Sequence, residues 1–263
     1  MVANPSAKKP HVEQTVPPRP AKETLPTMYD LPSEDPEEPG LPDEYHYLQP
    51  QLLSATLRLS TYTEDEVFSV GDMNLYYDVD HPRWYKRPDW FAVVGVPRLY
   101  EGRDMRLSYV VWQERANPFV VVELLSPGTE KEDLGQTTRD EGCLPPLGRD
   151  IPPNKWAVYE QILRIPYYIL FDRYTDHLRA FRLVGGHYQT LNFADQRIHI
   201  PEWGISLGVW QGSYQGIERL WLRWFDADNQ LILTAEERAE QAQAKSDRLA
   251  QRLRELGIDP DDI

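Results

Sequence analysis

The stretch Phe119-Val-Val-Val-Glu-Leu-Leu-Ser-Pro127 decides how this chain is interpreted. Valine and leucine fill nearly every position, which is typical of a strand buried on both faces, and Pro127 ends the run. One carboxylate, Glu123, stands in its middle. An ionised carboxylate that is buried without a partner costs on the order of several kcal/mol. We therefore expect a cation, a hydrogen-bond network or a metal ion beside Glu123.

A second acid points to the same chemistry. Asp89 follows Pro88 and precedes another apolar strand, Trp90–Val94. Two acids at the edges of buried strands are typical of metal-dependent phosphodiesterases, because Mg²⁺ prefers oxygen ligands and keeps several waters. Asp89 and Glu123 would supply two ligands, and the backbone carbonyl of Leu124 would supply a third from the end of its strand.

A helix that follows the Glu123 strand could bring further groups to this site. Lys155 and Tyr159 are four residues apart, which places both on one face of a helix. A lysine beside the ion would stabilise the charge that develops on the phosphorus centre, or help to deprotonate the attacking water. Each residue also has an ordinary explanation: Glu123 in a structural ion pair, Asp89 capping a turn, Lys155 solvated, and Tyr159 packed in the core.

The pattern of apolar residues predicts an α/β fold built on a mixed sheet. Helical spacing covers 49–59, and a capping box at Thr63–Glu66 predicts a short helix through Phe68. Asn154 is the expected N-cap of the crossover helix, and Gly185-Gly186 suits the turn of a hairpin. The remaining predicted elements are strands at 75–79, 90–94, 107–113, 119–125 and 167–171, a polar loop at 128–153, a helix at 154–163, and a hairpin at 178–191.

The two ends of the chain differ from this core. Residues 1–42 are rich in proline and acidic side chains, so we expect an acidic arm that stays disordered. Residues 43–228 would form the folded domain. Residues 229–263 would form a C-terminal helix that starts at the capping box of Thr234 and Glu237 and stops at Gly257. Leu249, Leu253 and Leu256 are spaced for one helix face, so the helix is either solvated or used for self-association.

Composition limits the possible partners and location. With a formal charge of −14 over 263 residues, the chain would bind nucleic acid only through a local basic face. Arg83, Lys86, Arg87 and Arg98 flank Asp89 and would form such a rim. Cys143 is the only cysteine, which fits a reducing compartment. No apolar run approaches the roughly 20 residues that span a bilayer, and the N-terminus lacks a signal sequence, so we expect a cytoplasmic protein without a membrane partner.

The motifs Pro88-Asp89, Val122-Glu123-Leu-Leu-Ser-Pro127, Lys155-x-x-x-Tyr159 and Pro166-Tyr-Tyr-Ile-Leu-Phe-Asp172, in this order, resemble those of the Uma-two family. That family consists of endonucleases of the restriction-endonuclease-like, PD-(D/E)xK class. The resemblance covers about residues 75–195. It implies a restriction-endonuclease-like mixed β-sheet with flanking helices, in which Asp89 and Glu123 are metal ligands.

The resemblance also implies roles for the helix. In the wider class a lysine lies two residues after the acid on the same strand, where this chain has Leu125. Lys155 would then take over the role of the lysine, and Tyr159 would be an accessory residue facing the site. The first hypothesis is a Mg²⁺- or Mn²⁺-dependent endonuclease that hydrolyses DNA, with a homodimer left open. The alternative is a nuclease-like interaction protein without catalytic activity.

Overall fold

The computed structural model describes residues 16–20, 24–25, 43–125, 133–135, 151–193, 195–256 and 259. The chain divides into two compact units, Met1–Tyr47 and Leu48–Ile263. Most of the predicted acidic arm and most of the predicted loop at 128–153 lie outside the described residues, as does the predicted helix stop at Gly257. The predicted domain boundaries at 42 and 228 remain predictions. No helix in the described ranges combines the length and the apolar character that crossing a bilayer requires.

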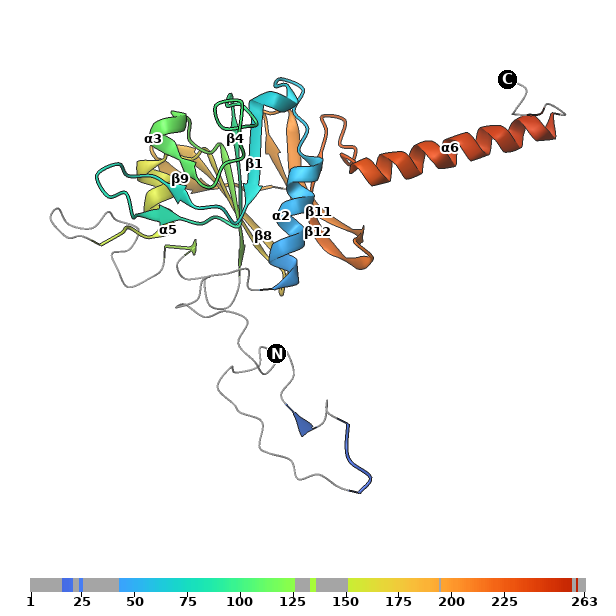
Figure 1. Cartoon of the computed structure of the whole chain (residues 1–263), viewed down its shortest axis with the longest axis horizontal. Coiled ribbons are helices and arrows are strands. Elements are labelled where there is room, and N and C mark those ends of the chain that lie inside the picture. Colours follow the sequence, from blue (N-terminus) through green and yellow to red (C-terminus); the bar gives the residue numbers. More distant parts are fainter. Residues whose placement is uncertain are drawn as a thin grey trace. The chain divides into compact units, whose positions relative to one another are not determined.

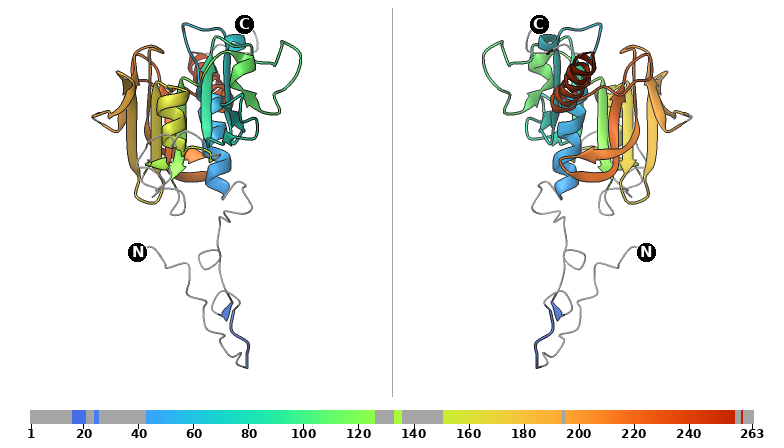
Figure 2. Two further views of the ribbon diagram at one scale, coloured as in Figure 1. Left: turned by 90° about the vertical axis from the view of Figure 1, so that its left-hand side faces the viewer. Right: turned by 90° about the vertical axis from the view of Figure 1, so that its right-hand side faces the viewer.

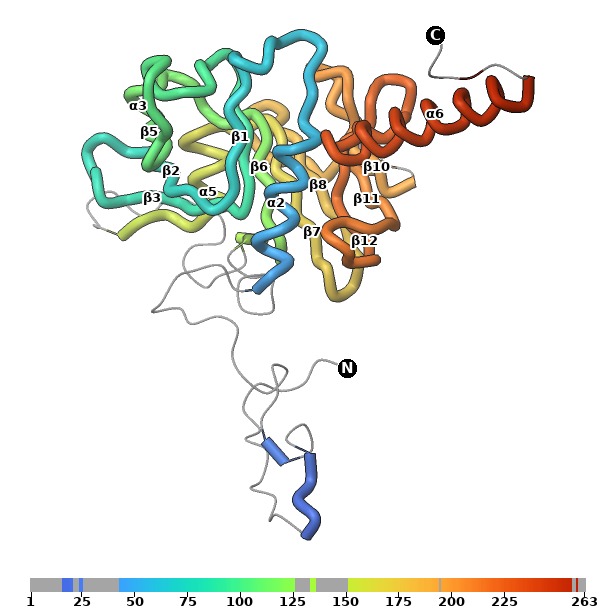
Figure 3. Tube along the Cα trace, turned by 45° about the vertical axis from the view of Figure 1, so that its right-hand side comes forward, coloured from blue at the N-terminus to red at the C-terminus, as the bar shows by residue number. Residues whose placement is uncertain are grey.

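The larger unit is built on a mixed sheet of six strands, shown in Figures 1 and 3. Their order is β1-β4-β6-β7-β8-β9; β6 and β7 are parallel, and every other neighbouring pair is antiparallel. The six strands are β1 (Val67–Gly71), β4 (Trp90–Val94), β6 (Val120–Leu125), β7 (Tyr167–Asp172), β8 (His177–Val184) and β9 (His187–Thr190). The predicted α/β fold with a mixed sheet and a crossover helix is confirmed.

Helical segments lie on both faces of this sheet (Figure 2). The crossover from β6 to β7 contains α5 (Lys155–Ala157) and the π-helix η2 (Val158–Ile162), which pack against the face that carries Phe91, Val121 and Tyr168. From Leu48 onward, α2 (Glu44–Thr56) contacts the opposite face, where the Trp90 indole donates to Ser54 at 2.9 Å.

A second sheet covers the Trp90 face of the first. It is antiparallel, in the order β10-β11-β12. Trp224 of β12 lies 5.9 Å from Trp90 and 6.1 Å from Trp203, measured between ring centroids. Trp221 and Trp224 are both buried in the core. The strands are β10 (Arg197–Ile200), β11 (Ile205–Tyr214) and β12 (Ile217–Phe225), and α6 (Ala235–Glu255) follows them.

Two local predictions were wrong, in both cases at segments where strand pairing with another part of the chain sets the structure. The capping box of Thr63 and Glu66 forms, but it starts only the 3-10 turn η1 (Glu64–Glu66), because β1 begins at Val67 and pairs with β4. The strand predicted at 107–113 is split into β5 (Tyr109–Val110) and the short helix α3 (Val111–Glu114). β5 joins β2 (Leu75–Tyr76) and β3 (Tyr85–Lys86) in a small third sheet.

Other local predictions are confirmed. The side chain of Asn154 accepts a hydrogen bond from the Ala157 N–H at 2.8 Å, as expected of an N-cap. Gly185 and Gly186 both have positive φ values, 62° and 97°, as a primed turn between β8 and β9 requires. Thr234 and Glu237 form the capping box that opens α6.

Candidate active site

The candidate site lies where β4 begins and β6 ends, and the pairing of the strands creates it. Trp90 is opposite Val122 in the antiparallel ladder, so the next pair along is Asp89 and Glu123. Residues alternate between the two faces of a strand. Glu123 therefore shares the face of Val121 and Leu125, the face that α5 and η2 cover.

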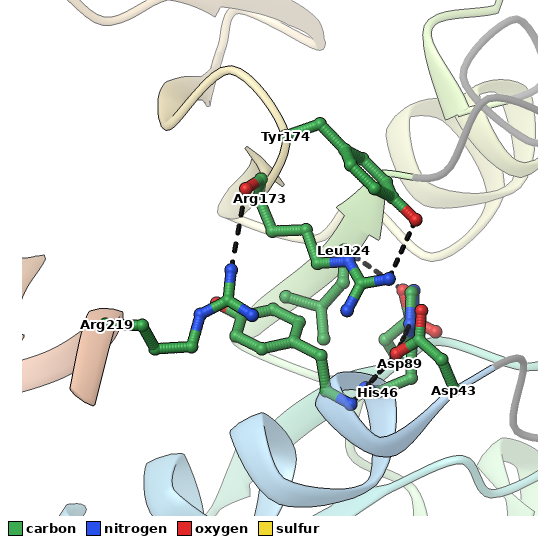
Figure 4. A network of polar contacts seen from close by, with 8 residues as sticks. Asp43, His46, Asp89, Leu124, Arg173, Tyr174 and Arg219 are labelled. Atoms are coloured by element: carbon green, nitrogen blue, oxygen red, sulfur yellow. Dashed lines mark hydrogen bonds and ion pairs between the residues drawn. The ribbon is translucent and has the colours of Figure 1, made fainter. Parts of the chain in front are cut away.

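Two hydrogen bonds connect Asp89 to the end of β6. The backbone N–H of Asp89 donates to Glu123 Oε2 at 3.2 Å. Asp89 Oδ2 accepts from the backbone N–H of Leu124 at 2.6 Å, which Figure 4 shows. Because the N–H and C=O of one strand residue point to the same side, the Leu124 carbonyl also points toward Asp89. Two carboxylates and one main-chain oxygen thus gather at one sheet edge.

Lys155 and Tyr159 reach Glu123 from the crossover helix. Lys155 Nζ lies 3.2 Å from Glu123 Oε2, and the Tyr159 hydroxyl donates to Glu123 Oε1 at 2.9 Å. The side chain of Glu123 is fully buried, and Lys155 is 15% exposed. The structure therefore brings together all four side chains singled out in the sequence, and it gives Glu123 both a cation and a hydrogen-bond donor.

One acid of this cluster was missed in the sequence. Asp133 Oδ1 lies 2.8 Å from Lys155 Nζ, and the Asp133 side chain is only 2% exposed. The buried Tyr168 hydroxyl donates to the Asp133 backbone carbonyl at 2.9 Å. In the sequence Asp133 ends the charged run Glu130-Lys-Glu-Asp133, which is typical of a solvated loop. No local signal distinguishes it from the acids beside it.

The electrostatics of the cluster follow from its burial. Burial raises the pKa of Glu123 well above its ordinary value; the charge of Lys155 opposes this shift, and those of Asp133 and Asp89 add to it. Burial by itself would lower the pKa of Lys155, but Asp133, Glu123 and Asp89 together raise it well above its ordinary value. Lys155 is therefore held in its charged form at neutral pH.

Of the four basic residues predicted to flank Asp89, Arg98 does not lie beside it. Arg98 follows β4, whereas Asp89 precedes it, so Arg98 lies beyond the opposite end of the strand from Asp89. Arg87 lies 2.7 Å from Asp72, with which it forms an ion pair. Leu125 at the end of β6 is paired with Asp172 at the end of β7. Arg173 and Tyr174 follow β7, so they lie beside the end of β6 that contains Leu124.

Among the described residues, no group of three or more His, Cys, Asp or Glu side chains is arranged to hold a metal ion. The set found here has a different composition, namely two carboxylates and a main-chain carbonyl. Such hard oxygen donors fit Mg²⁺ or Mn²⁺, which complete their coordination with water. The donor set therefore fits a divalent ion of this class.

Comparisons with known proteins identify a family. The sequence profile of the Uma2 family, described as "Putative restriction endonuclease", matches residues 22–211. A solved structure from Anabaena variabilis, described as a "putative nuclease belonging to DUF820", is similar over 61% of this chain and 74% of that chain, with 12% identity and a TM-score of 0.38. No curated protein matches. The family match spans most of the chain, so this protein belongs to the Uma2 family, and its mixed sheet with flanking helices is the predicted restriction-endonuclease-like fold.

Proposed function

We propose that this protein is an endonuclease that hydrolyses DNA phosphodiester bonds with a divalent ion, Mg²⁺ or Mn²⁺. The observation that carries the proposal is the hydrogen bonding of Asp89 to both Glu123 and Leu124, which gathers an oxygen donor set at one sheet edge. Membership of the Uma2 family supports the reaction class. The bound ion would polarise the phosphodiester and lower the pKa of a bound water.

The residues of the site would have separate roles in binding the ion, positioning Glu123 and stabilising charge. Asp89, Glu123 and the Leu124 carbonyl would hold the ion. The Tyr159 hydroxyl would hold Glu123 in place through their 2.9 Å hydrogen bond, so it acts as a positioning residue. The raised pKa of Lys155 favours a charged lysine that stabilises the developing negative charge over a lysine that deprotonates the attacking water.

Basic side chains near the end of β7 would contact the DNA backbone, with Arg173 from the residues after β7 and Arg219 from β12. Arg173 donates to the Tyr174 hydroxyl at 2.7 Å, and Arg219 donates to the Arg173 carbonyl at 3.5 Å; Figure 4 shows both contacts. Tyr174 is 57% exposed. Arginine is well suited to phosphate because its guanidinium is planar and always charged. A local cluster of this kind would allow an acidic protein to approach a polyanion.

The test combines cleavage with metal binding. Supercoiled plasmid with Mg²⁺ or Mn²⁺ should be cut by the wild-type chain and not by the Asp89→Ala variant, while urea unfolding shows whether that variant still folds. Titration calorimetry should give heat with Mn²⁺ for the wild type and none for Glu123→Gln. Metal-dependent cleavage by a folded Asp89→Ala variant would refute the assignment.

The alternative is a nuclease-like interaction protein without catalytic activity. The net charge of −14 favours it, since polyanion binding usually draws on many Lys and Arg residues. This alternative predicts no heat on titration with either ion and no cleavage by the wild-type chain. The same two measurements therefore separate the candidates.

A further inference from the structure

The C-terminal helix α6 carries a regular stripe of small and apolar residues that nothing in the described part of the chain covers. Alternating steps of four and three residues separate its members, which is the heptad spacing of a coiled coil. No residue of α6 is buried, and Leu249 and Leu256 are 57% and 64% exposed. The stripe consists of Ala235, Ala239, Ala242, Ser246, Leu249, Leu253 and, just after α6, Leu256.

The attachment of α6 to β12 turns this stripe outward. Glu237, in the first turn, forms an ion pair with the fully buried Arg223, at 2.7 Å and 2.9 Å from its two terminal nitrogens. Each helical residue advances 100° around the axis, so Glu237 points about 160–200° away from its stripe neighbours Ala235 and Ala239. The face that binds the folded core is therefore opposite the stripe.

The charges beside the stripe determine which partner fits. One flank carries Arg238, Lys245 and Arg252, seven residues apart, and the other carries Glu236, Gln243 and Ala250. In a parallel pair of identical helices, the basic flank would face Gln243 and Ala250. In an antiparallel pair it would face the same basic flank. Neither pairing supplies the opposite charges that stabilise a two-stranded coiled coil.

We propose that α6 binds a helix of another protein, one that has a heptad stripe of leucines flanked by acidic residues. Three basic positions would meet three acidic ones, and Leu249, Leu253 and Leu256 would be buried against the partner's stripe. Such pairing would attach the folded domain to another protein without using the candidate active site. The proposal is independent of the nuclease activity.

Synthetic peptides of three heptads test the charge pattern with the full-length chain. Both peptides carry leucine in the stripe; one has glutamate on both flanks and the other has lysine. Fluorescence anisotropy should show that the glutamate peptide binds at least about tenfold more tightly, the factor expected for three exposed ion pairs. The triple variant Arg238→Glu, Lys245→Glu, Arg252→Glu should reverse this preference.

Controls separate the proposal from its rivals. Leu249→Glu with Leu253→Glu should abolish binding, whereas Arg248→Glu with Arg254→Glu, off both flanks, should weaken it far less. Equal binding of the two peptides, or no binding, would overturn the proposal. So would a wild-type chain that sediments as a dimer and becomes monomeric in the double leucine variant. Binding of a DNA duplex that only the triple charge variant abolishes would assign the basic flank to nucleic acid instead.

Discussion

Replacing Lys155 by methionine tests the buried charge cluster of the candidate site. The ammonium group lies 2.8 Å from Asp133 and 3.2 Å from Glu123, whose side chains are 2% and 0% exposed. Methionine keeps most of the aliphatic stem but removes the charge, and so leaves two buried carboxylates without their cation. Removing one partner from a buried ion pair costs about 3–5 kcal/mol. This is a large fraction of the roughly 5–15 kcal/mol that stabilises a typical domain.

Urea unfolding at neutral pH in the presence of EDTA measures this loss. Lys245→Met, the same substitution at an exposed position of α6, is the matched control and should change the free energy of unfolding by less than about 0.5 kcal/mol. When Mn²⁺ replaces EDTA in the same experiment, it should restore more stability to Lys155→Met than it adds to the wild type, because an ion bound there would supply positive charge beside Glu123. A loss below about 1 kcal/mol for Lys155→Met would refute the reasoning.

Three further predictions concern single contacts. Tyr159→Phe removes the hydrogen bond to the Glu123 carboxylate and should cost about 1.5–3 kcal/mol by urea unfolding. Tyr168→Phe loses a hydrogen bond to a neutral carbonyl and should cost about 0.5–1.5 kcal/mol. Equal losses would contradict an ionised Glu123. Asn154→Ala removes the N-cap of the crossover helix and should cost about 1 kcal/mol, while Asn154→Asp, which keeps the cap, should cost little. Burial alone would raise the pKa of Glu237. Its hydrogen bonds to Arg223 and to the Thr234 N–H have the larger effect and lower the pKa below its ordinary value. Its contribution is therefore complete above about pH 4.3 and lost as the pH falls, so circular dichroism should show helix loss in acid that Glu237→Gln does not show.

The sequence predicted the elements whose side chains carry a strong signal. The uninterrupted apolar residues of β6 and β7 allow few arrangements other than buried strands, and Asn154 and Gly185-Gly186 have backbone roles that few residues fill. Glu123 was conspicuous because a charge in such a strand needs a partner. Its convergence with Asp89 was expected from the two acids at the ends of buried strands and from the family resemblance, but the register of β4 against β6 that produces it is not visible in the sequence.

Other features depend on contacts that a sequence does not display. Thr63 and Glu66 form their capping box, yet the pairing of β1 with β4 ends the helix after one turn. Lys155 of α5 and Tyr159 of the π-helical η2 both reach the site, although the hydrogen bonding of η2 differs from that of the α-helix assumed for this i, i+4 pair. Asp133 was missed because only the fold buries it beside Lys155.

The most direct test of the account is anomalous diffraction from crystals of the full chain grown with Mn²⁺. The account predicts one strong anomalous peak between the carboxylates of Asp89 and Glu123, within coordination distance of the Leu124 carbonyl. A map with no peak there, at Mn²⁺ concentrations that support cleavage, would contradict it.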